Sequence, residues 1–325
     1  MHSWNRAALA QTVLKGVLNT PEHGITNTIK IRILAACRGL LIRTGDPLIR
    51  YRLNGTEILL PLSHNLPVHR RSFPEYSSNI ARIARHVESK YADLTFIDVG
   101  ANVGDTVAIL RSTGHFPILC IEGDDTFFHV LQQNVAQFQG DVYLEHAFVA
   151  EATGTFKGWV NAQGGTAHLV EDESRREAIH AKALSDILKA HPRFAQSKMI
   201  KVDTDGFDCR ILRSELALLC RLKPVIFFEY DPYFFGQCKD DGFTVFESLQ
   251  SIGYETAIFY ENTGEYLLTS KLENKLLIED IHEFYSGRRG QRYCDICVFH
   301  ADDSDLCEVV RLSEIEFFNR LRCSV

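Results

Sequence analysis

The sequence predicts an α/β fold of the Rossmann-like type, with a mostly parallel seven-stranded sheet and helices on both of its faces. The first observation is that, from residue 94 onward, short apolar runs alternate with amphipathic helical stretches. Repeated units of this kind are typical of a parallel sheet that helices cover on both sides. The second is that the first apolar run leads directly into a glycine-containing loop, as ligand-binding turns in such sheets do.

The composition is that of an ordinary globular protein. The chain has 325 residues, of which 45% are hydrophobic and 24% are charged, which argues against disorder, collagen or a coiled coil. A formal net charge of −7 provides no general attraction to phosphate groups, so we expect no nucleic-acid partner. No signal segment and no bilayer-spanning apolar run are visible, which predicts a cytoplasmic protein without an integral membrane segment. These observations leave a membrane-bound substrate open.

The nine cysteines predict no metal site. Cys294 and Cys297 form the only C-x-x-C pair, no second pair stands at zinc spacing, and the pair lies in a strand-like run. We therefore expect reduced and mostly buried thiols, as in cytosolic proteins.

Residues 1–90 are expected to form an N-terminal extension. Apolar residues recur at helical spacing in its first half. Apolar and polar residues alternate over 49–62 on both sides of Asn54 and Gly55, a dipeptide that favours a two-residue β-hairpin turn. An amphipathic helix is predicted over 77–88, where apolar side chains share one face.

Residues 91–302 are expected to form the Rossmann-like domain, and 303–325 a C-terminal helix that packs on it. The glycine-rich stretch 151–172 interrupts the alternating pattern and predicts an inserted hairpin or loop at the sheet edge. The predicted strands are 95–99, 117–121, 142–149, 199–203, 225–230, 255–260 and 293–299. The predicted helices are 102–113, 125–138, 174–190, 207–221, 243–252 and 313–322.

The loop after the first strand carries the clearest functional signal. It reads DVGANVGDT over residues 98–106, and Gly100 allows both a sharp turn and the close approach of a ligand to the main chain. A dinucleotide loop would read G-x-G-x-x-G and leave room for a pyrophosphate, which Asp98 and Asp105 would repel. A cationic cofactor such as S-adenosylmethionine suits these acids, and Asp98 is placed to accept hydrogen bonds from its ammonium group. The candidate cofactor-binding residues of the loop are Asp98, Gly100, Ala101, Asn102, Gly104, Asp105 and Thr106.

The end of the second strand supplies three more cofactor candidates. Glu122 lies roughly twenty residues after the first loop, where a carboxylate can accept hydrogen bonds from two ribose hydroxyls. Gly123 follows it, and Phe127 either flanks the adenine or packs in the core. Asp124 is as well suited to cap the next helix as to contact the cofactor.

The fourth strand brings three carboxylates to one turn, which reads IKVDTDGFD over residues 200–208. Because Asp203, Asp205 and Asp208 repel one another, a cation, a hydroxylic ligand or a helix N-terminus should compensate them. Asp203 or Asp205 is the candidate general base for a reacting hydroxyl. A divalent ion is less favoured, since the rest of the EF-hand spacing is missing.

Two further residues are candidates for chemistry. Glu229 ends the fifth strand at the same rim and is a candidate base, metal ligand or substrate contact, with a structural ion pair as the alternative. His168 lies in the glycine-rich stretch and is a candidate base or substrate ligand, with a solvated loop histidine as the alternative.

At these residues the chain resembles the FkbM family of S-adenosylmethionine-dependent methyltransferases. The resemblance implies a Rossmann-like methyltransferase fold, S-adenosylmethionine as cofactor, and O-methylation of a sugar hydroxyl in a bacterial polysaccharide or glycolipid, or of a natural product. Many members carry D-V-E-G-x-E in place of residues 203–208 and a proline in place of Gly123. The matching stretches are FIDVGANVGD (96–105), IEGDD (121–125), ALSDIL (183–188), IKVDTDGFD (200–208) and KPVIFFEYD (223–231).

The acceptor is accordingly expected to be a hydroxyl-bearing small molecule or glycan, and the sequence predicts no oligomeric state. One rival is a catalytically inactive Rossmann-like binding domain, which the acids at Asp98, Glu122, Asp203 and Glu229 disfavour. A second rival is a dinucleotide-dependent oxidoreductase, whose loop spacing this chain lacks. Methylation of a base or a protein amine is disfavoured because D-T-D-G follows the fourth strand, where base methyltransferases often carry an Asn/Asp-Pro-Pro motif.

Overall fold

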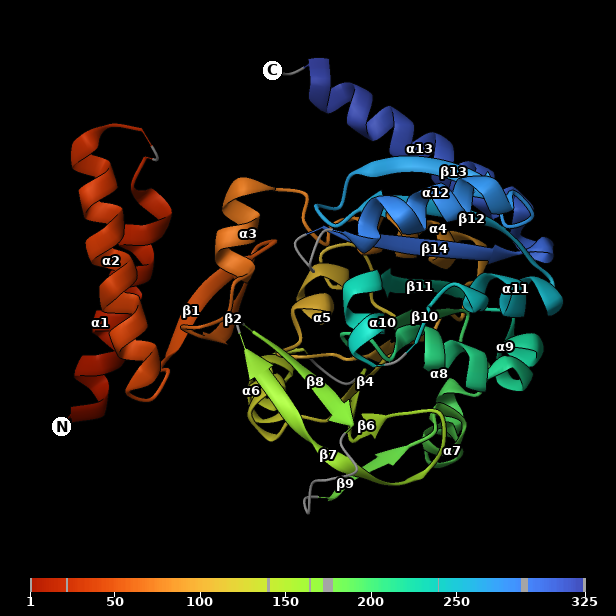
Figure 1. Ribbon diagram of the computed structural model, residues 1–325, viewed down its shortest axis with the longest axis horizontal. Helices are drawn as coiled ribbons and strands as arrows, with labels where there is room; N and C mark the ends of the chain where they lie inside the picture. Colours follow the sequence, from red (N-terminus) through yellow and green to blue (C-terminus); the bar gives the residue numbers. More distant parts are fainter. Residues whose placement is uncertain are drawn as a thin grey trace. The chain divides into compact units, whose positions relative to one another are not determined.

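The computed structural model describes residues 2–21, 23–138, 141–163, 165–171, 178–238, 240–287 and 292–323 (Figure 1). The chain divides into two compact units. The smaller comprises Met1–Pro74 and Ala162–Thr166, and the larger comprises Glu75–Asn161 and Ala167–Val325. Compact units and evolutionary domains need not coincide, so the domain boundaries expected at residues 90 and 302 stay predictions.

The smaller unit contains the helices and the hairpin that the sequence predicts. Figure 1 shows α1 and α2 side by side. Gly16 allows their close approach, since a Cβ at this position would lie only 2.9 Å from a methyl carbon of Leu34. Asn54 and Gly55 both have positive φ, as the tight turn of a right-twisted hairpin requires. The elements are α1 (His2–Asn19), α2 (Ile25–Arg43), β1 (Leu48–Leu53), β2 (Thr56–Pro61) and α3 (Leu66–Ser72).

The larger unit is built on an eight-stranded sheet with the order β13-β12-β14-β11-β10-β3-β4-β5. The strands from β11 to β5 are parallel, whereas β14 is antiparallel to both neighbours and β13 is antiparallel to β12. This confirms the Rossmann-like fold, with β13 as an edge strand beyond the seven predicted. The strands are β3 (Phe96–Val99), β4 (Ile118–Glu122), β5 (Val142–His146), β10 (Met199–Val202), β11 (Val225–Tyr230), β12 (Tyr254–Glu261), β13 (Tyr266–Lys271) and β14 (Cys294–His300).

Helices cover both faces of this sheet (Figure 1). Side chains alternate along β3, so Ile97 and Val99 face α7, α8, α9 and α11 and share one apolar core with them. Phe96 and Asp98 face the other way, toward the side where α4 contacts α5 and α13. The helices are α4 (Asn79–Lys90), α5 (Asp105–Leu110), α6 (Asp125–Val135), α7 (Leu184–Ala190), α8 (Asp208–Ser214), α9 (Leu216–Leu222), α10 (Pro232–Gln237), α11 (Thr244–Ser251), α12 (Lys275–Ser286) and α13 (Ser304–Cys323).

A separate four-stranded sheet, with the order β6-β9-β7-β8, corrects two predicted elements. The helix predicted over 174–190 is wrong in its first part, because 178–182 form β9, which pairs antiparallel with β7; residues 172–177 lie outside the described chain. The strand predicted over 142–149 divides, since β5 ends at His146 and β6 pairs with β9. Pairing with distant strands overrides local propensity here. The bounds are β6 (Phe148–Val149), β7 (Gly154–Gln163), β8 (Thr166–Glu171) and β9 (Ala178–Lys182).

Two predicted helices also differ in extent. The helix predicted over 207–221 is broken at Glu215, whose carboxylate accepts a hydrogen bond from the Ser185 N–H at 2.9 Å. The helix predicted over 102–113 begins only at Asp105, because the preceding loop contains residues in the left-handed region. The sequence did not predict β13 or α12. The C-terminal helix expected within 303–325 is α13, which begins earlier than the stretch 313–322.

The cysteines are free thiols, and the C-x-x-C pair is structural. Cys294 and Cys297 are completely buried in β14. Residues three apart on a strand point to opposite faces, so these two thiols do not form a redox pair.

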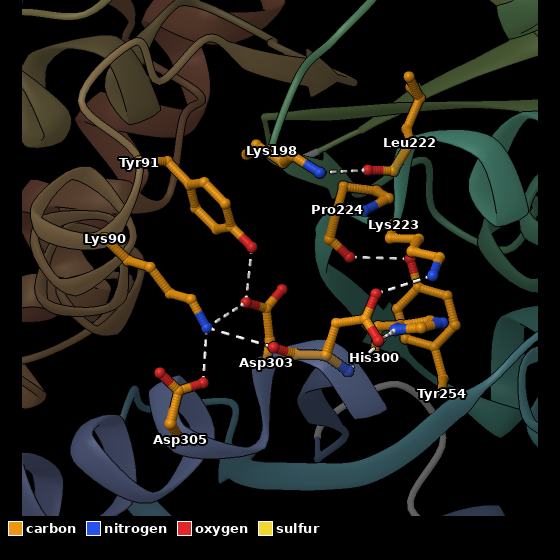
Figure 2. Close-up of polar contacts among 11 residues, drawn as sticks. Lys90, Tyr91, Lys198, Leu222, Lys223, Pro224, Tyr254, His300, Asp303 and Asp305 are labelled. Carbon is orange, nitrogen blue, oxygen red and sulfur yellow. Dashed lines mark hydrogen bonds and ion pairs between the residues drawn. The ribbon is translucent and has the colours of Figure 1, made fainter.

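A polar cluster closes the amino-terminal edge of the parallel strands (Figure 2). The buried Asp303 carboxylate accepts a hydrogen bond from the Tyr91 hydroxyl at 2.7 Å and pairs with the Lys90 ammonium at 2.8 Å. Burial and this hydrogen bond raise the pKa of Tyr91 to about 12. Beside them, the Tyr254 hydroxyl donates to the carbonyl of Pro224 at 2.8 Å. The cluster therefore ties the end of α4 to the start of α13.

Replacing Asp303 with Ala should lower the free energy of unfolding by about 2 kcal/mol, because a buried carboxylate loses its hydrogen bond from Tyr91 and its ion pair with Lys90. Replacing the exposed Asp305 with Ala should cost less than about 0.5 kcal/mol, although it also pairs with Lys90. Urea unfolding measures both changes. Equal effects of the two substitutions would contradict the structural role of Asp303.

Candidate functional site

Gly100 brings together the loops that follow β3 and β10. Its φ is 80°, and a Cβ at this position would lie 1.8 Å from the carbonyl oxygen of Asp203. The N–H groups of Gly100 and Ala101 donate to the carbonyl of Ile121 at 2.9 and 3.0 Å. Only a residue without a side chain allows the three strand ends to meet this closely.

The Glu122 carboxylate joins the loops that follow β3 and β4. It accepts hydrogen bonds from the N–H of Asn102 at 2.8 Å and from the N–H of Asp124 at 2.7 Å. Burial raises the pKa of Glu122 to about 7, although these hydrogen bonds act to lower it. Asp124 caps α6 by accepting hydrogen bonds from the N–H groups of Thr126 and Phe127. Helix capping was one of its two predicted roles.

A cavity opens at this carboxyl edge of the sheet. It holds about 520 Å³ of empty space, its open mouth included, which suits a small-molecule ligand. Apolar walls come from Val99, Ile121 and Phe207, and from Phe148 in β6. Seven of the sequence-predicted residues line it: Gly100, Asn102, Glu122, Gly123, Phe127, Asp203 and Asp205.

The other loop candidates do not line this cavity. Asp98 and Ala101 are buried, and Thr106 is buried in α5, which begins at Asp105. Gly104 has a φ of 84°, and a Cβ there would lie 2.8 Å from a methyl carbon of Leu131. These residues shape the turn and the start of α5, and their contacts with a cofactor stay predictions.

Lys201 supplies the cation that the acidic turn requires. It pairs with Asp98 in the parallel register of β3 and β10, so the two side chains lie on the same face of the sheet. Its buried ammonium lies 3.3 Å from a carboxylate oxygen of Asp98 and 3.0 Å from one of Asp203. Burial raises the pKa of Asp98 to about 6, even though the Lys201 charge acts to lower it. One buried cation thus compensates two carboxylates.

The other acids of the turn are held differently. The Asp208 carboxylate accepts hydrogen bonds from the N–H groups of Thr204 at 2.9 Å and Gly206 at 3.0 Å, which closes the turn before α8. Asp205 has a positive φ of 51° and lines the cavity. Burial, together with the charges of Asp203 and Asp208, raises the pKa of Asp205 well above its usual value. No group of acidic, histidine or cysteine residues suited to a metal ion occurs in the described part of the chain.

Asp203 and Glu229 form a pair of interacting carboxyl groups beside the cavity. Partial burial acts to raise the pKa of Asp203, but the Lys201 charge and a hydrogen bond from Glu229 bring that pKa below its usual value. Burial and the charge of Asp203 raise the pKa of Glu229 well above its usual value. Asp203 is therefore the ionised member of the pair, and its side chain is 41% exposed.

Further polar side chains surround this pair on the α4 face of the sheet. Asp295 of β14 is the register partner of Glu229, and the amide of Asn79 acts to lower its pKa. Burial and the charge of Asp203 raise the pKa of Asp295 to about 8. Tyr76 and Tyr293 share a hydrogen bond close to these carboxyl groups. The result is a polar surface next to the cavity.

Sequence reasoning missed Lys201 and Asp295. Lys201 lies two residues before Asp203, so strand alternation places both on one face, but its partner Asp98 is found only when β3 and β10 are paired. Asp295 lies next to Glu229 only because β14, far along the chain, pairs antiparallel with β11, and the sequence does not reveal that register. His168 lies in β8, and its side chain falls outside the described part of the structure.

The comparison with known families identifies the domain that forms this site. Residues 98–256 match the family model described as the methyltransferase FkbM domain. This part of the chain is therefore a methyltransferase domain of the FkbM family, and its methyl donor is S-adenosylmethionine. No curated protein matches the chain.

Solved structures of methyltransferases are similar to the chain at low sequence identity. The methyltransferase domain of METTL16 is 11% identical and has a TM-score of 0.43, over 92% of this chain and 92% of that one. A SAM-dependent methyltransferase from Agrobacterium tumefaciens is 9% identical, with a TM-score of 0.42, over 78% of this chain and 70% of that one. Methyltransferase FkbM from Methylobacillus flagellatus KT is 12% identical, with a TM-score of 0.35, over 78% of this chain and 56% of that one.

Replacing Lys201 with Met should destabilise the protein by about 3–5 kcal/mol near pH 8, because Asp98 and Asp203 lose their shared cation. The loss should shrink toward pH 5. In the unfolded chain Asp98 releases its proton with a pKa of about 4, whereas in the folded variant it would keep that proton to a higher pH. The free energy of unfolding of the variant therefore falls as the pH rises above about 4.

Urea unfolding near pH 5 and pH 8 measures this difference. Replacing Lys275, which is exposed on α12, with Met is the matched control and should leave the stability nearly unchanged at either pH. A loss that does not depend on pH would show that Lys201 acts through packing alone.

Proposed function

We propose, from the premise that residues 98–256 are a methyltransferase FkbM domain, that this chain methylates a hydroxyl oxygen of a saccharide, glycolipid or natural product. The observation that carries the proposal is the Asp203 carboxylate. It lines the cavity, stays ionised beside Lys201 and is exposed enough to meet an acceptor. A carboxylate of this kind suits a hydroxyl nucleophile, whose proton must leave as the new bond forms.

The cavity has features that fit S-adenosylmethionine. The Glu122 carboxylate can accept hydrogen bonds from ribose hydroxyls, while Phe127 and Phe148 offer apolar surface to an adenine. The hydroxyl oxygen of Thr204, also in the cavity lining, is buried without a hydrogen-bond partner in the described part of the chain. Such an atom is favourable only where a ligand or water satisfies it.

The reaction follows from the placement of these side chains. Bound S-adenosylmethionine supplies an electrophilic methyl group on a sulfonium. Asp203 would accept the hydroxyl proton while the acceptor oxygen forms its bond to the methyl carbon and the carbon–sulfur bond breaks. Lys201 would keep Asp203 ionised before the reaction, and Glu229 would hold it in place through their hydrogen bond. Alignment of the reacting atoms supplies much of the rate.

The polar surface beside Asp203 supports a saccharide-like acceptor. Carboxyl groups and tyrosine hydroxyls, here Glu229, Asp295, Tyr76 and Tyr293, can both donate and accept hydrogen bonds with a polyhydroxylated molecule. A role in polysaccharide biosynthesis is part of this proposal.

S-adenosylhomocysteine should bind the purified protein with a dissociation constant of about 1–100 µM, whereas NADH should not bind. Replacing Glu122 with Gln should weaken that binding about 10–100-fold, because charge-assisted hydrogen bonds to the ribose are weakened. Replacing the exposed Asp125 with Asn is the control and should leave the affinity unchanged. Isothermal calorimetry measures all three, and binding of NADH in place of S-adenosylhomocysteine would refute the cofactor assignment.

Replacing Asp203 with Asn should lower kcat/KM by about 10²–10⁴-fold while S-adenosylhomocysteine affinity changes less than about threefold. Replacing Asp205 with Asn should cost less than about tenfold, because burial and the charges of Asp203 and Asp208 favour the protonated form of its carboxyl group, which cannot accept the proton. Transfer of labelled methyl groups to polysaccharide and glycolipid extracts, as an alkali-stable methyl ether, is the assay. Full activity of the Asp203 variant, or a labelled amine product, would exclude this mechanism.

A further inference from the structure

The N-terminal part of the chain differs sharply in charge from the rest. Residues 1–74 contain ten lysines and arginines but only three aspartates and glutamates, which gives a formal charge of +7. The whole chain has a formal charge of −7, so residues 75–325 carry −14. An acidic protein therefore begins with a strongly basic unit, which the composition of the whole chain conceals.

Helix α2 in this unit presents a stripe of exposed apolar side chains. Ile25, Ile29, Ile33 and Leu40 are 83%, 55%, 59% and 63% exposed. Their spacing places them on one face of the helix. The opposite face already packs on α1, where Leu34 meets Gly16. Large aliphatic side chains that share a face and stay exposed indicate a surface that something else covers.

Cations border this stripe, and acids are missing from it. The helix sequences of α1 and α2 contain no aspartate or glutamate. Lys30, Arg32 and Arg43 on α2 are exposed, and none of them has an ion pair within the described part of the chain. A helix that combines exposed aliphatic residues with uncompensated cations matches the chemistry of an anionic lipid surface.

We propose that the exposed face of α2 docks on the surface of a membrane that contains anionic lipids. The aliphatic stripe would enter the boundary between headgroups and acyl chains, while Lys30, Arg32 and Arg43 pair with lipid phosphates. No helix in the described part of the chain is long and apolar enough to cross a membrane, so the contact would lie in the plane of the interface.

Charge favours this occupant over the two main rivals. A second copy that met this face with its own α2 would bring the same cations to the contact, and like charges repel. A nucleic acid would satisfy the cations, but the stripe offers isoleucine and leucine where single-strand binders use aromatic side chains for base stacking. The proposal concerns residues 1–74 alone and does not depend on the methyl acceptor.

Co-sedimentation of the full chain with vesicles tests the proposal. The protein should bind vesicles of phosphatidylcholine mixed with phosphatidylglycerol, bind phosphatidylcholine vesicles weakly, and dissociate as the salt concentration rises. The double substitution Ile29→Ser/Ile33→Ser should weaken binding at least about tenfold. The double substitution Lys30→Gln/Arg32→Gln should weaken it about fivefold for each charge removed.

The control is Leu276→Ser/Leu312→Ser, which removes two exposed leucines from α12 and α13 and should leave vesicle binding unchanged. Circular dichroism and S-adenosylhomocysteine binding verify that each variant is folded. Three outcomes would overturn the proposal: no binding of the wild-type chain to anionic vesicles, equal binding by the stripe variant, or a dimer in light scattering that the stripe substitutions dissociate. Preferential capture of single-stranded RNA over vesicles would also overturn it, in favour of a nucleic-acid surface.

Discussion

The placement of one ammonium group between two carboxylates makes the carboxyl edge of this sheet possible. Asp98 and Asp203 end neighbouring parallel strands, and without a cation their repulsion would oppose the close approach of the two loops. Lys201 is fixed between them by strand register, 3.3 Å from one carboxylate and 3.0 Å from the other. Gly100 then lets the loops meet, because no side chain separates it from the backbone of Asp203. Together they hold both sides of the cavity in position.

The side chains at this edge divide into two groups by the direction in which they point. Glu122, Phe127 and Phe148 border the cavity, where we propose that the nucleoside of the cofactor binds. Glu229 and Asp295 lie on the face that α4 covers, where carboxyl groups of raised pKa can donate as well as accept hydrogen bonds. Asp203 belongs to both groups. In the proposed reaction a methyl group passes from the first region to the second, and this carboxylate lies between them.

Local sequence was sufficient for features that depend on short segments. The turn at Gly100 and the hairpin turn at Asn54 follow from neighbouring residues, and the structure has both as predicted. Glu122 ends β4 as expected, and its contact with a ribose stays a prediction. Features that depend on distant partners were missed or wrong. Lys201 looked like an ordinary strand residue until register paired it with Asp98, and β9 was predicted as helix because its partner β7 lies about twenty residues earlier. The periodicity of apolar residues predicts the structure of one segment, whereas the pairing of distant strands depends on the whole fold.

The hydrogen bonds of Glu122 have a consequence for how a ligand is recognised. Each oxygen of its carboxylate accepts one backbone N–H, from Asn102 and from Asp124, and each retains a second acceptor position. Two adjacent hydroxyls would therefore meet a side chain whose rotamer is already fixed. Immobilising such a side chain costs about 0.5–1.5 kcal/mol of entropy, and this entropy is already lost when the protein folds, before a ligand binds. The two backbone hydrogen bonds therefore preorganise Glu122 for the ribose contact proposed above.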